Sequence, residues 1–186
     1  ANLEKGIEAS CHTRQHLAGE DLATIIYTSG TTGEPKGVML TQSNLATNTL
    51  ATIEAFSCED DDLRLNFLPL SHIFARTCDL YCWLAGGTRM AIAQSRDTVI
   101  ADCQAVKPTV LNGVPHFYDR VYRGLSEKGL AETPGALRAA LGGEIRMCCG
   151  GGAALPEHLF DFFHSRGVPL LQGYGLTESS PVVTLS

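Results

Sequence analysis

The chain has 186 residues, of which 44% are hydrophobic and 18% are charged, and its formal net charge is -6. A globular chain of this length buries ~70% of its unfolded surface. No segment concentrates Lys and Arg, which excludes an electrostatic nucleic-acid interface, and no apolar run is long enough to span a bilayer. The seven cysteines form no C-x-x-C pair. We therefore expect reduced, mostly buried thiols and a cytoplasmic protein rather than a zinc site.

Short apolar runs alternate with longer helical patterns along the chain. This alternation predicts an α/β fold, with a layered, mostly parallel sheet flanked by helices. The expected strands span residues 23–29, 37–41, 63–69, 88–93, 109–114, 144–149 and 168–175. Helices are expected from about 71 to 84, ending at Gly86 and Gly87, then over 97–106 and near 134–141.

For three more helices, apolar residues three or four positions apart predict a stripe that faces the core. Their members are Ala46, Leu50 and Ile53; Phe117, Val121 and Leu125; and Leu159, Phe160 and Phe163. Thr41 is expected to cap the first of these helices, while Pro115 and Pro156 suit the first turns of the other two. The four acids at 59–62 are interpreted as a solvated turn, because consecutive acids cannot converge on a metal without other ligands.

Small hydroxylated residues crowd the stretch from Tyr27 to Gly37, YTSGTTGEPKG, between the first two expected strands. The hydroxyls, the backbone amides beside the glycines and the lysine charge suit a polyphosphate. Counted from Gly30, however, Pro35 stands where the Walker phosphate loop needs glycine, and Gly37 where it needs Ser or Thr. A Walker loop is therefore excluded, and the simpler alternative is a flexible turn between two strands.

Four segments carry a family resemblance. YTSGTTGEPKGVMLTQSNL resembles the phosphate-loop signature of the adenylate-forming superfamily, the AMP-binding enzymes that include acyl-CoA synthetases, luciferases and peptide-synthetase adenylation domains. GGGAALP (150–156) is similar to its adenine-side loop, and QGYGLTESSPVVT (172–184) to its second nucleotide signature. LPLSHIFART (68–77) is most similar to long-chain fatty acid–CoA ligases. The resemblance covers nearly the whole chain and implies part of the large N-terminal domain of an acyl-CoA synthetase-like fold.

The resemblance implies that the parent enzyme activates a fatty acid with ATP, releases pyrophosphate, and passes the acyl group from AMP to CoA. ATP and CoA would be co-substrates, with Mg²⁺ bound at the phosphates. Two alternatives stay open. One is adenylation with transfer to an acyl carrier protein, or adenylation of an aryl or other carboxylic acid, and the other is a non-catalytic nucleotide-binding module.

The same resemblance implies roles for individual residues. The β- and γ-phosphates would be held by Thr28, Ser29, Gly30, Thr31, Thr32, Gly33 and Lys36. AMP would lie against Gly152, Ala153, Ala154, Gly173, Tyr174, Gly175 and Thr177, with the Tyr174 ring on the adenine. The catalytic set would be Lys36, His72, Thr177 and Glu178, in which Thr177 donates to the α-phosphate and Glu178 ligates Mg²⁺. His72 and Arg76 would face the acyl substrate.

Two positions depart from the usual pattern: Gly150 stands where a serine is common, and His116 where many long-chain members carry arginine. The superfamily also uses a ribose-binding aspartate, a hinge and a C-terminal domain with a catalytic lysine, all downstream of the second nucleotide signature. We therefore expect residues 1–186 to be a partial N-terminal AMP-binding domain, with negligible ligase activity without the lysine-bearing domain. The parent's substrates would be small molecules, and the parent could associate peripherally with a membrane.

Overall fold

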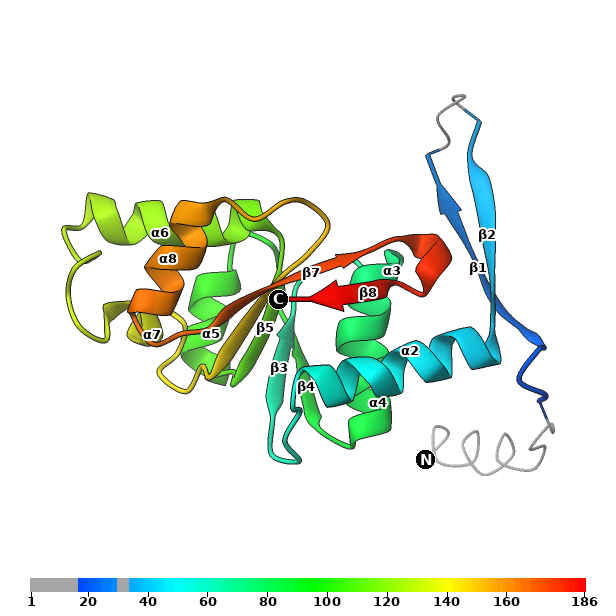
Figure 1. The fold of residues 1–186 in the computed structure, drawn as a ribbon. Helices are drawn as coiled ribbons and strands as arrows, with labels where there is room; N and C mark the ends of the chain where they lie inside the picture. Colours follow the sequence, from blue (N-terminus) through cyan, green and yellow to red (C-terminus); the bar gives the residue numbers. More distant parts are fainter. Residues whose placement is uncertain (1–16, 30–33) are drawn as a thin grey trace.

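The computed structural model describes residues 17–29 and 34–186, which form two sheets with helices around them (Figure 1). The larger sheet has six strands in the order β4-β3-β5-β6-β7-β8. Strand bounds are β1 Leu22–Thr28, β2 Lys36–Thr41, β3 Leu63–Asn66, β4 Arg89–Ile92, β5 Val110–Gly113, β6 Met147–Gly150, β7 Leu170–Gly175 and β8 Val182–Leu185. Strands β3 to β7 pair in parallel, and β8 runs antiparallel to β7. The predicted α/β fold with a mostly parallel sheet is confirmed.

The strands expected at 23–29 and 37–41 form an antiparallel hairpin of their own, outside the main sheet. Figure 1 shows this β1-β2 hairpin projecting away from the other elements. Helix α2 (Gln42–Ala55) follows β2 directly. Thr41 caps it as predicted, because its Oγ1 accepts a hydrogen bond from the backbone N–H of Asn44 at 3.2 Å. The hairpin therefore passes without a loop into a helix that packs on the main domain.

Helices lie on both faces of the main sheet (Figure 1). Their bounds are α3 Ile73–Ala75, η1 Arg76–Tyr81, α4 Cys82–Gly86, α5 Val99–Val106, α6 Pro115–Glu127, α7 Ala136–Ala140, α8 Glu157–Ser165 and η2 Thr177–Ser179. Leu111 and Cys148 face the core that α5, α6, α7 and α8 complete. Their neighbours Val110 and Cys149 face the opposite side and pack with Cys78 of η1. This alternation buries the central strands on both faces, which is typical of parallel strands covered by helices.

The predicted stripe of α6 is confirmed, because all three of its members are buried. The stripe predicted for α2 is wrong: Leu50 is 61% exposed, and the buried residues of that helix are Thr49 and Thr52. Thr52 can be buried because the helix backbone satisfies its hydroxyl: its Oγ1 donates to the carbonyl of Asn48 at 2.7 Å. Thr49 Oγ1 has no hydrogen-bond partner among the described residues. In α8 Phe160 is likewise exposed, and Phe162 is buried in its place.

The helix expected from about 71 to 84 is present, but its middle, η1, is a π-helix between α3 and α4. Gly87 ends it in the left-handed conformation at φ 65°. Asp79 of η1 is buried and accepts hydrogen bonds from the side-chain amides of Asn66 at 2.8 Å and Asn112 at 2.6 Å. Burial raises the pKa of Asp79 to about 6 although both amides oppose this shift. Buried hydrogen bonds from Asn66 and Asn112 to Asp79 thus attach the π-helical segment to β3 and β5.

The acidic run at 59–62 is only partly a solvated turn. Asp62 is 1% exposed, and its carboxylate accepts hydrogen bonds from Arg146, from Thr109 and from the N–H of Glu59. A sequence pattern could not reveal this, because Arg146 lies more than 80 residues away.

Six cysteines lie in the described part, all as free thiols, and all but Cys58 are buried. Burial raises the pKa of both Cys103 and Cys149 to about 12, so these thiols stay protonated and unreactive. Of the helices in the described ranges, none combines the length and apolar character that crossing a bilayer requires.

Candidate active site

Two adjoining cavities lie where the parallel strands end. Ligands bind at this edge of open α/β sheets, because the loops that leave the carboxyl ends of the strands converge there. The first, which we call the α6-side cavity, has a volume of about 400 Å³ and is lined by Phe67, Leu68, Pro69, His72, Phe74, Ala75, Arg96, Val114, His116, Phe117, Arg120 and Gly152. The second, the hairpin-side cavity, has about 340 Å³, and its lining includes Thr28, Ser29, His72, Phe74, Gly151, Gly152, Gly173, Tyr174, Gly175, Thr177 and Glu178.

The two cavities share a wall made by His72, Phe74 and Gly152. The Phe74 ring lies against the loop after β6, and a Cβ added to Gly151 would come within 2.8 Å of its Cζ atom. Glycine at this position lets the ring approach the backbone closely. A ligand group beside this wall can therefore contact ligands in either cavity.

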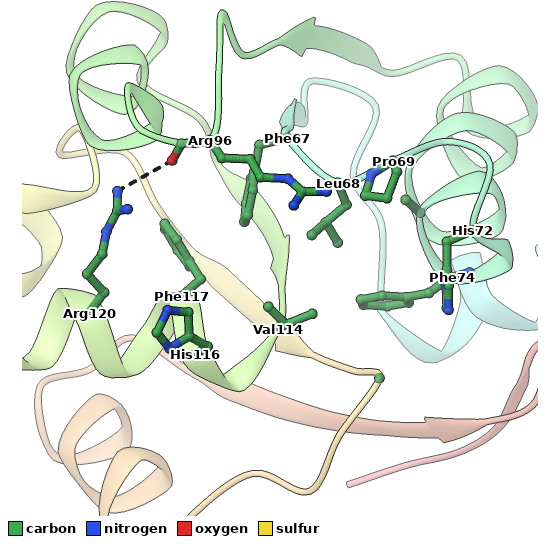
Figure 2. A pocket seen from close by; sticks show the side chains of 12 residues that line it. Phe67, Leu68, Pro69, His72, Phe74, Arg96, Val114, His116, Phe117 and Arg120 are labelled. Carbon is green, nitrogen blue, oxygen red and sulfur yellow. Dashed lines mark hydrogen bonds between the residues drawn. The ribbon is translucent and has the colours of Figure 1, made fainter. Parts of the chain in front are cut away.

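His72 is oriented by its own backbone. It stands at the N-cap of α3, and its Nδ1 accepts a hydrogen bond from the N–H of Phe74 at 3.2 Å. In the neutral imidazole the proton is then on Nε2, so the ring offers a hydrogen-bond donor to a ligand. Figure 2 shows His72 and Phe74 together at one end of the α6-side cavity.

The α6-side cavity is apolar along its walls and basic at one end. The rings of Phe67 and Phe117 pack with centroids 4.7 Å apart, and Figure 2 shows them beside each other, away from His72. Arg96 and Arg120 lie near this far end, where Arg120 Nη2 donates to the backbone carbonyl of Arg96 at 3.4 Å. Such a space suits an apolar chain better than a compact polar ligand.

The hairpin-side cavity is more polar and is bounded by the turn between β7 and β8. Glu178 of η2 is exposed, and its carboxylate has no hydrogen bond or ion pair to any residue of the described ranges. Gly175 has to be glycine, because a Cβ there would lie 2.0 Å from the carbonyl oxygen of Pro181. Tyr174 is 57% exposed, so its ring is free to cover a flat ligand.

The structure brings together many of the residues that the sequence singles out. The hairpin-side cavity contains Thr28, Ser29, His72, Gly152, Gly173, Tyr174, Gly175, Thr177 and Glu178. Neither cavity is lined by Lys36, Ala153, Ala154 or Arg76. Gly30, Thr31, Thr32 and Gly33 lie outside the described residues. Their phosphate-binding role stays a prediction.

Arg76 is engaged away from the α6-side cavity. Its Nε donates to the carbonyl of Leu70 at 2.9 Å, and its Nη1 donates to Thr24 Oγ1 in β1 at 3.0 Å. These bonds tie the hairpin to the loop that carries His72. The substrate contact of Arg76 stays a prediction, and in this structure its guanidinium links the carbonyl of Leu70 to the side chain of Thr24.

The comparisons with known proteins agree with this geometry. The profile of the AMP-binding enzyme family matches residues 2–186. The chain belongs to the AMP-binding enzyme family. Long chain acyl-CoA synthetase 2 of Arabidopsis thaliana is 32% identical over 202 residues, which cover 86% of this chain and 30% of that protein. The chain thus spans about a third of the curated relatives that it matches.

Solved structures of AMP-binding enzymes share the fold. ATP-bound MatB from Rhodopseudomonas palustris superposes with a TM-score of 0.73 at 31% identity, covering 91% of this chain and 32% of MatB. The inhibitor-bound N-terminal domain of FACL13 from Mycobacterium tuberculosis gives a TM-score of 0.77 at 25% identity, covering 100% of this chain and 45% of that one. The recognition of the superfamily from four segments is therefore confirmed.

Sequence reasoning missed three residues around the site. Phe74 is part of the shared wall, Gly151 lies against its ring in the hairpin-side cavity, and Asn48 contacts the turn that carries Glu178. Phe74 and Gly151 lie inside the recognised segments, but their mutual contact depends on the tertiary fold. The position of Asn48 beside Thr49 and Thr52 could have indicated a polar contact, because the apolar residues of this helix do not form a buried face.

Proposed function

We propose that the protein containing this chain joins a carboxylic acid to ATP, forming an acyl-adenylate and pyrophosphate, and then transfers the acyl group to CoA. The observation that carries the proposal is the shared wall of His72, Phe74 and Gly152 between an apolar and a polar cavity. An acid in the α6-side cavity would present its carboxylate beside a nucleotide in the hairpin-side cavity. Two relatives support this, since MatB was solved with ATP bound and the Arabidopsis relative is an acyl-CoA synthetase.

In the first step a carboxylate oxygen forms a bond to the α-phosphorus, and the bond from this phosphorus to the β-phosphate bridging oxygen breaks. The protein's task is positioning and charge stabilisation, since no covalent bond to the enzyme forms. His72 would hold the carboxylate through Nε2–H, and Thr177 would donate to an α-phosphate oxygen. In the second step the CoA thiolate attacks the acyl carbonyl, and AMP leaves with the bonding electrons.

A magnesium ion fits the hairpin-side cavity. Mg²⁺ is usually held by one or two carboxylates together with substrate phosphates, and Glu178 supplies one exposed carboxylate that no described residue engages. Glu178 would therefore hold the ion. When bound, Mg²⁺ neutralises charge on the phosphates of ATP and on the departing pyrophosphate.

We favour a medium- to long-chain fatty acid as the substrate. The support is the apolar wall of the α6-side cavity, with Phe67, Leu68, Val114 and Phe117, and the long-chain name of the Arabidopsis relative. Each methylene that leaves water contributes ~0.8 kcal/mol, so an apolar channel of this kind selects for chain length.

We also propose that residues 1–186 are part of the large N-terminal domain, and that a lysine-bearing C-terminal domain completes the catalytic protein. The support is that the chain covers 30% of the Arabidopsis relative. The expected peripheral membrane association of the parent belongs to the same proposal, and co-sedimentation with phospholipid vesicles would test it.

The experiment is acid-dependent exchange of labelled pyrophosphate into ATP, measured on the full-length protein with a series of fatty, aryl and dicarboxylic acids. We expect exchange with fatty acids, followed by thioester formation when CoA is added. Exchange with thioester formation only on an acyl carrier protein would instead select the carrier alternative. ATP binding without exchange for any acid would contradict the proposal and leave a nucleotide-binding module.

A further inference from the structure

Asn48 of α2 makes a bridge to the turn between β7 and β8. Its Nδ2 donates to the carbonyl of Val182 at 2.8 Å and to that of Ser179 at 3.3 Å, and its Oδ1 accepts from the N–H of Val182 at 3.1 Å. The amide thus pairs with both backbone groups of Val182, as a neighbouring strand would. In Figure 1 the helix α2 lies alongside β8.

Only a carboxamide can make this set of bonds. Two carbonyl oxygens require a side chain with two N–H donors, and the N–H of Val182 requires an acceptor on the same group. Aspartate would place negative oxygens against two carbonyls, and a hydroxyl or an apolar side chain would leave backbone groups unpaired. The contact is half-buried, where an unpaired group costs more than at the open surface.

The turn that Asn48 holds carries two residues of the proposed reaction. Thr177 and Glu178 lie directly before Ser179, whose carbonyl Asn48 binds. The following residue, Ser180, is 4% exposed and has a left-handed φ of 76°, which a non-glycine residue keeps only when its surroundings hold it. Thr77 of η1 supports the same residue by donating to its carbonyl at 3.3 Å.

Asn48 also connects the turn to the hairpin. It lies two turns into α2, and this helix continues directly from β2. Because one rigid helix carries the hairpin at its start and Asn48 in its middle, the bridge fixes the turn relative to the hairpin. Contacts between β2 and η2 are consistent with this arrangement.

We propose that Asn48 is a positioning residue: it holds the Thr177–Glu178 turn at a fixed place relative to the β1-β2 hairpin. Its catalytic consequence rests on the proposed function, whereas the structural bridge does not. A displacement of about 1 Å in a catalytic group can cost about 100-fold in rate. Losing the bridge should therefore lower the rate of adenylation without weakening the binding of the acid.

The test uses Asn48→Leu, which keeps the size of the side chain and removes its polar atoms, together with Asn48→Asp. The matched control is Asn44→Ala on the same helix, which removes the bond that Asn44 Oδ1 accepts from the N–H of Thr41 but does not touch the turn. The first readout is backbone hydrogen exchange in the full-length protein. In Asn48→Leu we expect the amide of Val182 to exchange at least about 10-fold faster, with β5 unchanged and the control like the wild type.

The second readout is pyrophosphate exchange. We expect kcat to fall about 10- to 100-fold in Asn48→Leu, with the KM of the acid within about 2-fold, and a loss of similar size in Asn48→Asp, whose negative oxygens would face two carbonyls. Unchanged exchange at Val182, or an equal loss of kcat in Asn44→Ala, would overturn the proposal. If the wild type shows no activity with any acid, the proposed function fails, while hydrogen exchange still decides whether the bridge exists. If Asn48→Leu does not fold, Asn48→Asp gives both readouts.

Discussion

Asp62 and Arg146 form an ion pair that joins the turn before β3 to the residue before β6. Arg146 Nε donates to Asp62 Oδ1 at 2.8 Å, and its Nη2 contacts the other carboxylate oxygen. The Asp62 side chain is 1% exposed and that of Arg146 is 26% exposed. The pair therefore links two segments far apart in sequence at the edge of the core.

This ion pair predicts a pH-dependent stability. Burial alone raises the pKa of Asp62, but hydrogen bonds from Arg146, Glu59 N–H and Thr109 outweigh burial and hold the pKa below its usual range. Because the folded value lies below the unfolded one of ~3.9, the stabilisation is complete above about pH 4 and is lost as the pH falls through the folded value.

We expect Asp62→Asn to lower the free energy of unfolding by about 2 kcal/mol near neutral pH, since it leaves a partly exposed arginine without its partner. Urea unfolding at several pH values measures this difference, which should shrink below about pH 4. The control is Asp119→Asn, which removes the i,i+4 pair with the exposed Arg123 and a 4.0 Å contact with His158, and should cost less than about 0.5 kcal/mol. Equal losses in both variants would contradict the role of Asp62.

The variant His72→Asn tests the proposed substrate contact of His72 separately from its role as the N-cap of α3. Asparagine can still accept the hydrogen bond from the N–H of Phe74, because it is a good N-cap residue, but it lacks the imidazole Nε2–H. We expect kcat/KM for the acid to fall about 100-fold in pyrophosphate exchange, with the melting temperature nearly unchanged. A normal rate would remove His72 from the proposed catalytic set.

Glu178→Gln tests the proposed magnesium ligand. The change removes the charge and keeps the shape, so the Mg²⁺ concentration needed for half-maximal exchange should rise at least about 10-fold, and kcat should fall. Titration of Mg²⁺ at saturating ATP measures both. Glu54→Gln, an exposed acid on α2 outside both cavities, should leave both values unchanged.

Val114→Phe narrows the α6-side cavity, because Val114 lines it beside the shared wall. We expect long acids to lose more than short ones: kcat/KM for a long-chain acid should fall at least about 10-fold relative to that for a short-chain acid. The ratio of the two kcat/KM values, measured in one competition assay, does not change if the substitution lowers the activity with all acids equally. An unchanged ratio would place the acyl chain elsewhere.

The sequence was sufficient to predict the motifs and the layers of the fold, but not the contacts between distant segments. The stripe of α6 was predicted correctly because Phe117, Val121 and Leu125 face a purely apolar core. The stripe of α2 was not, because that helix packs partly through polar groups, and Asn48 is bound by a turn more than 130 residues away. Likewise, Asp62 looked like a solvated acid until its arginine partner was known.

The wall of His72, Phe74 and Gly152 has a consequence for how substrate preference can change. Any substitution that reshapes this wall alters both cavities at once, so a gain for a new acid would disturb the nucleotide side as well. Residues at the opposite end, such as Phe67, Phe117 and Arg120, line the α6-side cavity alone. Diversification of acid specificity, natural or engineered, should therefore concentrate on α6 and on the loops that face it, and leave the wall intact.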